Sequence, residues 1–406
     1  MSATADDPRF ARRHHIGEIF LTFLRLGLTS FGGPVAHLGY FRNEFVVRRK
    51  WLDEGAFVDL IALCQFLPGP ASSQVGFALG LSRGGLSGGL AAWLGFTLPS
   101  AVALFAFAEL SGTLNGRFAH AAIHGLKIVA VAVVAQAVWG MARTLLSDLQ
   151  RVLIAVGGAL LVSLFPGSLA QIAAISFGAI LGLVLCRQAV SAPSGHLAFS
   201  ISRGLGIASL AIFFAVLFGA PLGAAILHSN ALTLFDAFYR SGALVFGGGH
   251  VVLPLLKAAL VDPGLVTANS FLSGYGAAQA VPGPLFTVSA YLGAVASVPP
   301  RRITGAAIAL FGIFLPGMLI LVGALPFWDE FRKRLSAQAV MRGVNAAVVG
   351  ILAAALYNPV WTGAIFGLRD FALALVGFLL LTVWKLPAWF VVLGTTAGAV
   401  ASVILA

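Results

Sequence analysis

The sequence predicts an all-α membrane protein that crosses the bilayer many times and is built from two homologous repeats. Of its 406 residues 59% are hydrophobic and only 10% are charged, whereas soluble proteins carry about 25% charged residues. Apolar stretches of roughly the 20 residues that a membrane helix needs recur along the whole chain. Motifs of the first half return in the same order in the second half. The composition excludes an ordinary soluble enzyme, a nucleic-acid-binding protein and a disordered chain.

Charge and cysteine content support this class. The formal net charge is +11, but the basic residues lie in short scattered groups, which is typical of cytoplasmic loops and not of a nucleic-acid-binding face. Cys64 and Cys186 both lie in apolar runs and have neither a disulfide framework nor metal-ligand spacing. We therefore predict no metal, no cofactor and no nucleic-acid partner.

The apolar stretches form thirteen segments between a polar, basic N-terminal arm and the C-terminus. Residues 187–203 are the most polar stretch between long segments and predict a linker. The predicted organisation is therefore a first repeat over 1–186, a linker and connecting helix over 187–228, and a second repeat over 229–406. The predicted segments are 17–40, 55–81, 85–110, 120–143, 151–166, 168–186, 204–227, 232–256, 268–295, 303–327, 338–357, 365–384 and 387–405.

Four collinear matches define the repeat. The first spans seven identical residues 215 positions apart: Phe20, Phe23, Arg25, Gly27, Phe31, Gly32 and Gly33 return as Phe235, Phe238, Arg240, Gly242, Phe246, Gly247 and Gly248. The second matches Gln65 and Pro68-Gly69-Pro70 with Gln279 and Pro282-Gly283-Pro284. The third matches Gly95 and Pro99 with Gly312 and Pro316, and the fourth matches His124-Gly125 with Arg342-Gly343. Each repeat holds about six helical segments.

The segment count predicts that the repeats have opposite orientations. If all thirteen segments cross, an odd number of crossings separates equivalent positions, which is a known plan of transporters. Alternatively, segments 17–40 and 232–256 re-enter the membrane without crossing it, and the distribution of Lys and Arg does not decide between these topologies.

The repeated Gly and Pro motifs predict broken helices. Pro-Gly-Pro inside an apolar segment cannot continue an α-helix, and Phe-Gly-Gly interrupts it through backbone freedom. We expect residues 31–34, 67–70, 246–249 and 281–284 to be non-helical and to converge near the bilayer midplane, where half-helix N-termini favour an anion. The candidate substrate-binding glycines are Gly32, Gly33, Gly69, Gly247, Gly248 and Gly283. The alternative is that these residues serve helix packing and kinks.

Arg25 and Arg240 are the main candidates for binding an anionic substrate. Each lies inside an apolar segment six residues before a Phe-Gly-Gly motif. A charge in the membrane core costs about 3 kcal/mol or more, so it usually faces a partner or a cavity. The guanidinium suits a tetrahedral oxyanion because its donors form a planar fork. The alternative is an internal ion pair, for Arg240 with Asp236 on the same helix face and for Arg25 with Glu18.

Other polar residues in apolar segments are further candidates. Asp59, Asp236 and Glu18 are candidates for coupling transport to protons. Gln65 and Gln279 precede the two Pro-Gly-Pro motifs by one turn and could donate to an oxyanion. Lys127 and Asn345 occupy matching places in the repeats, and His250 follows the second glycine run. Hydrogen bonding between helices is the alternative for these side chains.

This doubled motif set resembles the chromate ion transporter family in its long, two-domain form. The resemblance rests on Phe31-Gly-Gly-Pro34, Phe246-Gly-Gly-Gly-His250 and the two Gln-x-x-Pro-Gly-Pro motifs, and it covers residues 16 to 400. It implies a multi-pass protein of the bacterial cytoplasmic membrane, not an enzyme, that exports chromate by secondary active transport, with protons as the coupling ion, and so gives chromate resistance. It also leaves room for a homodimer in the lipid bilayer.

Three alternatives remain open in the sequence. Sulfate is a dianion of nearly the same shape, so the substrate could be sulfate or another tetrahedral oxyanion. An anion channel would share the same apolar composition. A membrane-embedded enzyme would need a concentrated acid–base or metal constellation, whereas the eight histidines are dispersed.

Overall fold

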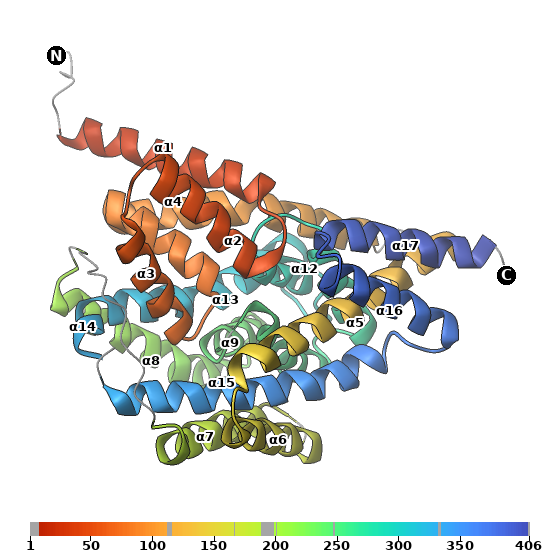
Figure 1. The fold of residues 1–406 in the computed structure, drawn as a ribbon. Helices are drawn as coiled ribbons and strands as arrows, with labels where there is room; N and C mark the ends of the chain where they lie inside the picture. The colour runs from red at the N-terminus through yellow and green to blue at the C-terminus, as the bar shows by residue number, and fades with distance from the viewer. Residues whose placement is uncertain are drawn as a thin grey trace.

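The computed structural model describes residues 8–111, 116–165, 167–187, 199, 201–246, 248–331 and 334–404. Within these ranges every regular element is helical (Figure 1). The prediction of an all-α fold is therefore confirmed.

The first repeat begins with α1, which starts at Pro8 inside the stretch that the sequence suggested was a polar arm. A π-helical segment, Arg42–Arg48, continues α2. α4 changes direction at Gly84 and Gly85, which have non-helical backbone angles, as the predicted boundary between segments 55–81 and 85–110 requires. The helices are α1 (Pro8–Thr29), α2 (Gly33–Phe41), α3 (Glu54–Phe66), α4 (Ala71–Ser111), α5 (Arg117–Leu145), α6 (Leu149–Leu164) and α7 (Ser168–Leu185).

The connecting helix α8 (Arg203–Leu227) packs against α9 and α13 of the second repeat. The second repeat follows the order of the first, with shorter helices. These are α9 (Asn230–Ala243), α10 (Val252–Leu256), α11 (Ala268–Ala278), α12 (Val288–Ala294), α13 (Arg302–Ala324), α14 (Trp328–Phe331), α15 (Leu335–Ala355), α16 (Leu368–Thr382) and α17 (Ala388–Ile404).

Five of the described helices are long and apolar enough to cross a membrane. They are Ala71–Ser111, Arg117–Leu145, Arg203–Leu227, Arg302–Phe331, which runs from α13 through α14, and Leu335–Trp361, which extends α15. Many large apolar side chains on these helices are exposed, as a lipid-facing surface requires. The chain is a multi-pass membrane protein.

The predicted helix breaks lie at or beside the repeated motifs. Residues 67–70 and 281–284 are non-helical, as expected. The prediction for residues 31–34 and 246–249 was partly wrong. Gly33 and Pro34 already belong to α2, because proline is well tolerated in a first turn, and Gly249 begins a 3-10 turn. Gly247 lies outside the described residues.

The breaks of one repeat contact those of the other. The Gly69 N–H donates to the Val245 carbonyl (2.8 Å), and the Gly283 N–H donates to the Ser30 carbonyl (2.9 Å). Both glycines have positive φ angles, 124° and 99°, which side-chain-bearing residues rarely adopt. Because Ser30 and Val245 are equivalent positions, the two bonds are reciprocal, as in interfaces related by a two-fold axis. Each Pro-Gly-Pro break therefore contacts the chain just before the Phe-Gly-Gly motif of the other repeat.

The C-terminal helices of each repeat are exchanged between repeats. α6 and α7 pack against α15, whereas α16 and α17 pack against α5 (Figure 1). The first contact is very close, because a Cβ on Gly343 would lie 2.0 Å from the Gly178 carbonyl oxygen. Small residues permit this backbone approach in membrane helices. The repeats are therefore interlocked.

Candidate functional site

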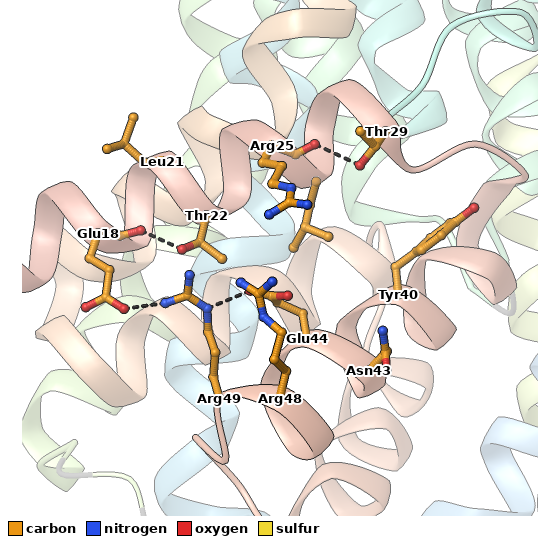
Figure 2. Close-up of a pocket in the computed structure, with 11 residues that line it drawn as sticks. Glu18, Leu21, Thr22, Arg25, Thr29, Tyr40, Asn43, Glu44, Arg48 and Arg49 are labelled. Atoms are coloured by element: carbon orange, nitrogen blue, oxygen red, sulfur yellow. Dashed lines mark hydrogen bonds and ion pairs between the residues drawn. The ribbon is translucent and has the colours of Figure 1, made fainter.

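Arg25 lies in a pocket of about 450 Å³ between α1, α2 and the segment Arg42–Arg48. Its guanidinium points across the pocket toward the side chains of Arg48 and Glu44 (Figure 2). Leu21, Thr22, Thr29 and Tyr40 complete much of the wall. The pocket is thus formed by the helix before the first break and the helical segments after it.

The Arg25 pocket has more positive than negative side chains. Glu44 accepts hydrogen bonds from Arg48 (2.9 Å) and Arg49 (2.6 Å), and Arg49 also forms an ion pair with Glu18. Arg25 has no ion-pair partner among the residues that the structure describes. The sequence-based alternative that Glu18 pairs with Arg25 is therefore wrong, and three arginines face two carboxylates.

Arg240 lies in an equivalent pocket of the second repeat, of about 670 Å³. Asp236, Leu244 and Leu255 occupy the places that Leu21, Thr29 and Tyr40 occupy in the first. Here Arg240 forms an ion pair with Asp236, whose side chain is 6% exposed. The alternative prediction that Arg240 forms an internal ion pair with Asp236 therefore agrees with the structure.

The two arginines occupy separate pockets and do not meet in one central site. The break glycines Gly32, Gly33, Gly69, Gly248 and Gly283 line neither pocket. The amides of Gly69 and Gly283 already donate across the repeats, so they are not free for an anion. The sequence predicted one anion site formed by both arginines and the broken helices. The structure instead has a separate pocket around each arginine. The broken helices of the two repeats contact each other through Gly69 and Gly283, and we call this contact the crossing.

The two candidate glutamines differ in exposure. Gln65 is exposed on α3, and the Gln279 side chain donates to the Tyr275 carbonyl of its own helix (3.4 Å). Sequence reasoning missed Gln74, whose buried amide donates to the carbonyls of Pro68 (3.0 Å) and Gly317 (2.9 Å). A polar residue one turn after Pro-Gly-Pro in an apolar run was the available signal.

The remaining candidates make contacts between distant segments. Asp59 is fully buried, and its Oδ1 accepts from the Trp328 indole N–H (3.2 Å). Lys127 on α5 donates to Asn269 at the start of α11 (2.9 Å).

The last two candidates lie near α11 and on α15. His250 Nδ1 lies 2.7 Å from the Tyr275 hydroxyl. The Asn345 Oδ1 atom is buried without a hydrogen-bond partner in the described part of the chain. Across the same residues, no group of three or more His, Cys, Asp or Glu side chains could hold a metal ion.

Comparison with known proteins places both repeats in one family. The sequence profile described as Chromate transporter matches residues 17–183 and 232–402. A chromate transport protein of Pseudomonas aeruginosa is 30% identical over 353 residues, covering 83% of this chain and 79% of the relative. A probable chromate transport protein of Synechococcus elongatus is 26% identical, covering 90% and 88%, and a chromate transport protein of Cupriavidus metallidurans is 25% identical, covering 85% and 83%.

No solved structure matches the chain. The profile matches the two repeats found in the sequence and covers most of the described helices, and the family consists of transporters and not enzymes. The chain therefore belongs to the chromate transporter family.

Proposed function

We propose that this protein carries chromate, or a tetrahedral dianion of the same shape, out of the cell across the bacterial cytoplasmic membrane. The named relatives support chromate as the substrate class. The excess positive charge of the Arg25 pocket is the structural observation that supports it most directly.

Arg25 is the substrate-binding arginine in this proposal. A dianion that leaves water needs full charge and several hydrogen bonds to offset its lost hydration. Arg25 offers a planar fork of donors that no described carboxylate occupies, and Arg48 lies opposite it (Figure 2). Arg240 is assigned a structural role, because Asp236 already neutralises it.

The proposed coupling involves both repeats. We infer that the repeats are inverted, with their two-fold axis in the membrane plane and the break crossing near the midplane, and that 1–186, 187–228 and 229–406 are the units of the repeat plan. The reciprocal bonds of Gly69 and Gly283 support a two-fold relation between the repeats, and an axis in the membrane plane is a common plan of transporters built from repeats. Asp59 is the coupling carboxylate, because it is fully buried in the first repeat beside Trp328 of the second.

The test is chromate accumulation in cells that express the protein and in cells that express Arg25→Gln at the same membrane level. Export predicts lower accumulation and greater resistance with the unaltered protein, and neither with the variant. Equal accumulation in all cells would contradict the chromate assignment. Higher accumulation with the unaltered protein would contradict export while keeping transport. Ion currents without dependence on a pH gradient would favour a channel.

A further inference from the structure

The two repeats have the same sequence plan but differ in how their central helices are covered. In the second repeat, α11 packs against α5, and α10 packs against α15. In the first repeat, the described residues of α3 and α2 have no comparable packing with α15 and α5. The two repeats therefore differ because α5 and α15 both pack against helices of the second repeat, α11 and α10.

Side chains at equivalent positions of the two repeats differ in exposure in the same way. Val58 on α3 is 48% exposed, but its counterpart Leu272 on α11 is 1% exposed. Tyr40 on α2 is 41% exposed, but its counterpart Leu255 on α10 is 5% exposed. Val58 and Tyr40 are thus uncovered on α3 and α2, whereas their counterparts on α11 and α10 are buried.

The contact between α5 and α11 in the second repeat brings the two helix backbones close together. A Cβ on Gly276 would lie 2.0 Å from the Leu126 carbonyl oxygen, so the two backbones touch. Next to this point, the Lys127 ammonium donates to Asn269. The repeat relation maps Gly276 onto Ala62 and Leu126 onto Val344, and it maps the Lys127–Asn269 pair onto Asn345 and Gly55. These counterparts lie on α3 and α15, which do not pack together here.

We propose that the uncovered face of α2 and α3 is a docking surface for α5 and α15 of the same chain in a second conformation. In that conformation α15 packs on α3 and α5 packs on α2, while α11 and α10 become uncovered. The two arrangements use homologous helices of the two repeats, so one chain can populate both. Ala62 stands at the place of Gly276 and Gly55 at that of Asn269, so α15 packs on α3 less closely than α5 packs on α11. The exchange deepens the proposed transport function on which it rests, since it opens the central crossing alternately to either side.

The inference is tested by spin-label distances in full-length protein reconstituted in lipid, in a Cys64→Ala, Cys186→Ala background. One pair replaces Lys127 and Asn269 by labelled cysteines, and the counterpart pair replaces Gly55 and Asn345. A third pair, at His124 and Asp370, reports the contact of α5 with α16, which should not change. Distances are measured at several pH values, with and without chromate or sulfate.

The proposal predicts two distance populations for the first two pairs. As the short-distance fraction of the 127/269 pair falls, that of the 55/345 pair rises by the same fraction, while the 124/370 distance stays constant. Gly276→Val should favour the short 55/345 distance, because its side chain blocks the α5–α11 contact. Ala62→Trp is the matched variant and should abolish that short distance.

A 55/345 distance that stays long under every condition and in Gly276→Val would overturn the proposal. So would a short 55/345 distance while the 127/269 distance also stays short. If the distances exchange but chromate transport fails, the proposed substrate is wrong and the docking surface stands. If chromate is transported without any exchange, the docking surface is wrong and the substrate assignment stands.

Discussion

Arg25 and Arg240 are repeat-equivalent, yet the structure predicts that removing Arg240 lowers stability and that removing Arg25 abolishes transport. Asp236 is buried, with its side chain 6% exposed, and Arg240 is its ion-pair partner, with a side chain 43% exposed. Removing one partner of a buried pair costs about 3–5 kcal/mol. Because water reaches part of Arg240, we expect a smaller loss for Arg240→Gln, about 2–3 kcal/mol. That loss lowers the folding equilibrium constant roughly 30- to 150-fold.

The double variant Asp236→Asn, Arg240→Gln tests whether Arg240 matters only because it neutralises Asp236. It leaves no unpaired buried charge, so the expected loss falls below about 1 kcal/mol, and the double variant should transport chromate. Arg25→Gln should instead keep the stability of the unaltered protein, since no described carboxylate pairs with Arg25, but should abolish transport. Arg25→Lys should restore transport in part, because it keeps the charge and loses the fork.

The assay is thermal or denaturant unfolding in detergent, combined with oxyanion uptake by the same preparations. The reasoning would be refuted if Arg25→Gln lowered stability as much as Arg240→Gln does. A stable, transport-inactive double variant would also refute it, because Arg240 would then contact the substrate.

Three further predictions concern the crossing, the interlocked helices and the substrate. Gln74→Leu removes the side-chain donor shared by the buried carbonyls of Pro68 and Gly317 and should lower the free energy of unfolding by about 1–3 kcal/mol, whereas Gln65→Leu on the exposed face of α3 should change it by less than about 0.5 kcal/mol. Gly343→Val should separate α15 from α7 and prevent accumulation of folded protein, judged by size-exclusion chromatography, whereas Gly140→Ala, which has open space, should not. Excess sulfate should reduce chromate uptake because the two dianions share charge and shape, and unchanged uptake would show that the site distinguishes them.

Much of the fold follows from local sequence. Apolar length predicts the membrane class, and Pro-Gly-Pro predicts a break wherever it occurs, because proline lacks the N–H donor. The boundaries at the Phe-Gly-Gly motifs were less predictable. Proline is tolerated in the first turn of a helix, so α2 begins at Gly33, earlier than the glycines alone indicate.

The exchange of C-terminal helices between repeats could not be predicted from periodicity. The contacts of α15 with α6 and α7 depend on which of several small-residue faces meet, and a single chain carries no signal for that choice.

The sequence indicated candidate residues for the site, but not which side chains on other elements they contact. Repeat symmetry selected Arg25 and Arg240, and each of them lines a pocket of its own repeat. Helical spacing identified the Asp236 pair, because both residues lie on one helix. It could not identify the Glu18–Arg49 pair or the Asp59–Trp328 bond, since those partners lie on different elements. Symmetry also suggested equal roles for the two arginines, and only the surrounding charges distinguish them.

The most direct test of the central claim is uptake of radiolabelled chromate into liposomes that contain the purified protein, with and without an imposed pH gradient. The proposed function predicts concentrative uptake by the unaltered protein that requires the gradient, and none by Arg25→Gln under the same conditions. Uptake by Arg25→Gln equal to that of the unaltered protein would contradict the assignment of the Arg25 pocket as the substrate site. Absence of gradient-driven uptake by the unaltered protein, once its correct folding is verified, would contradict proton-coupled chromate transport itself.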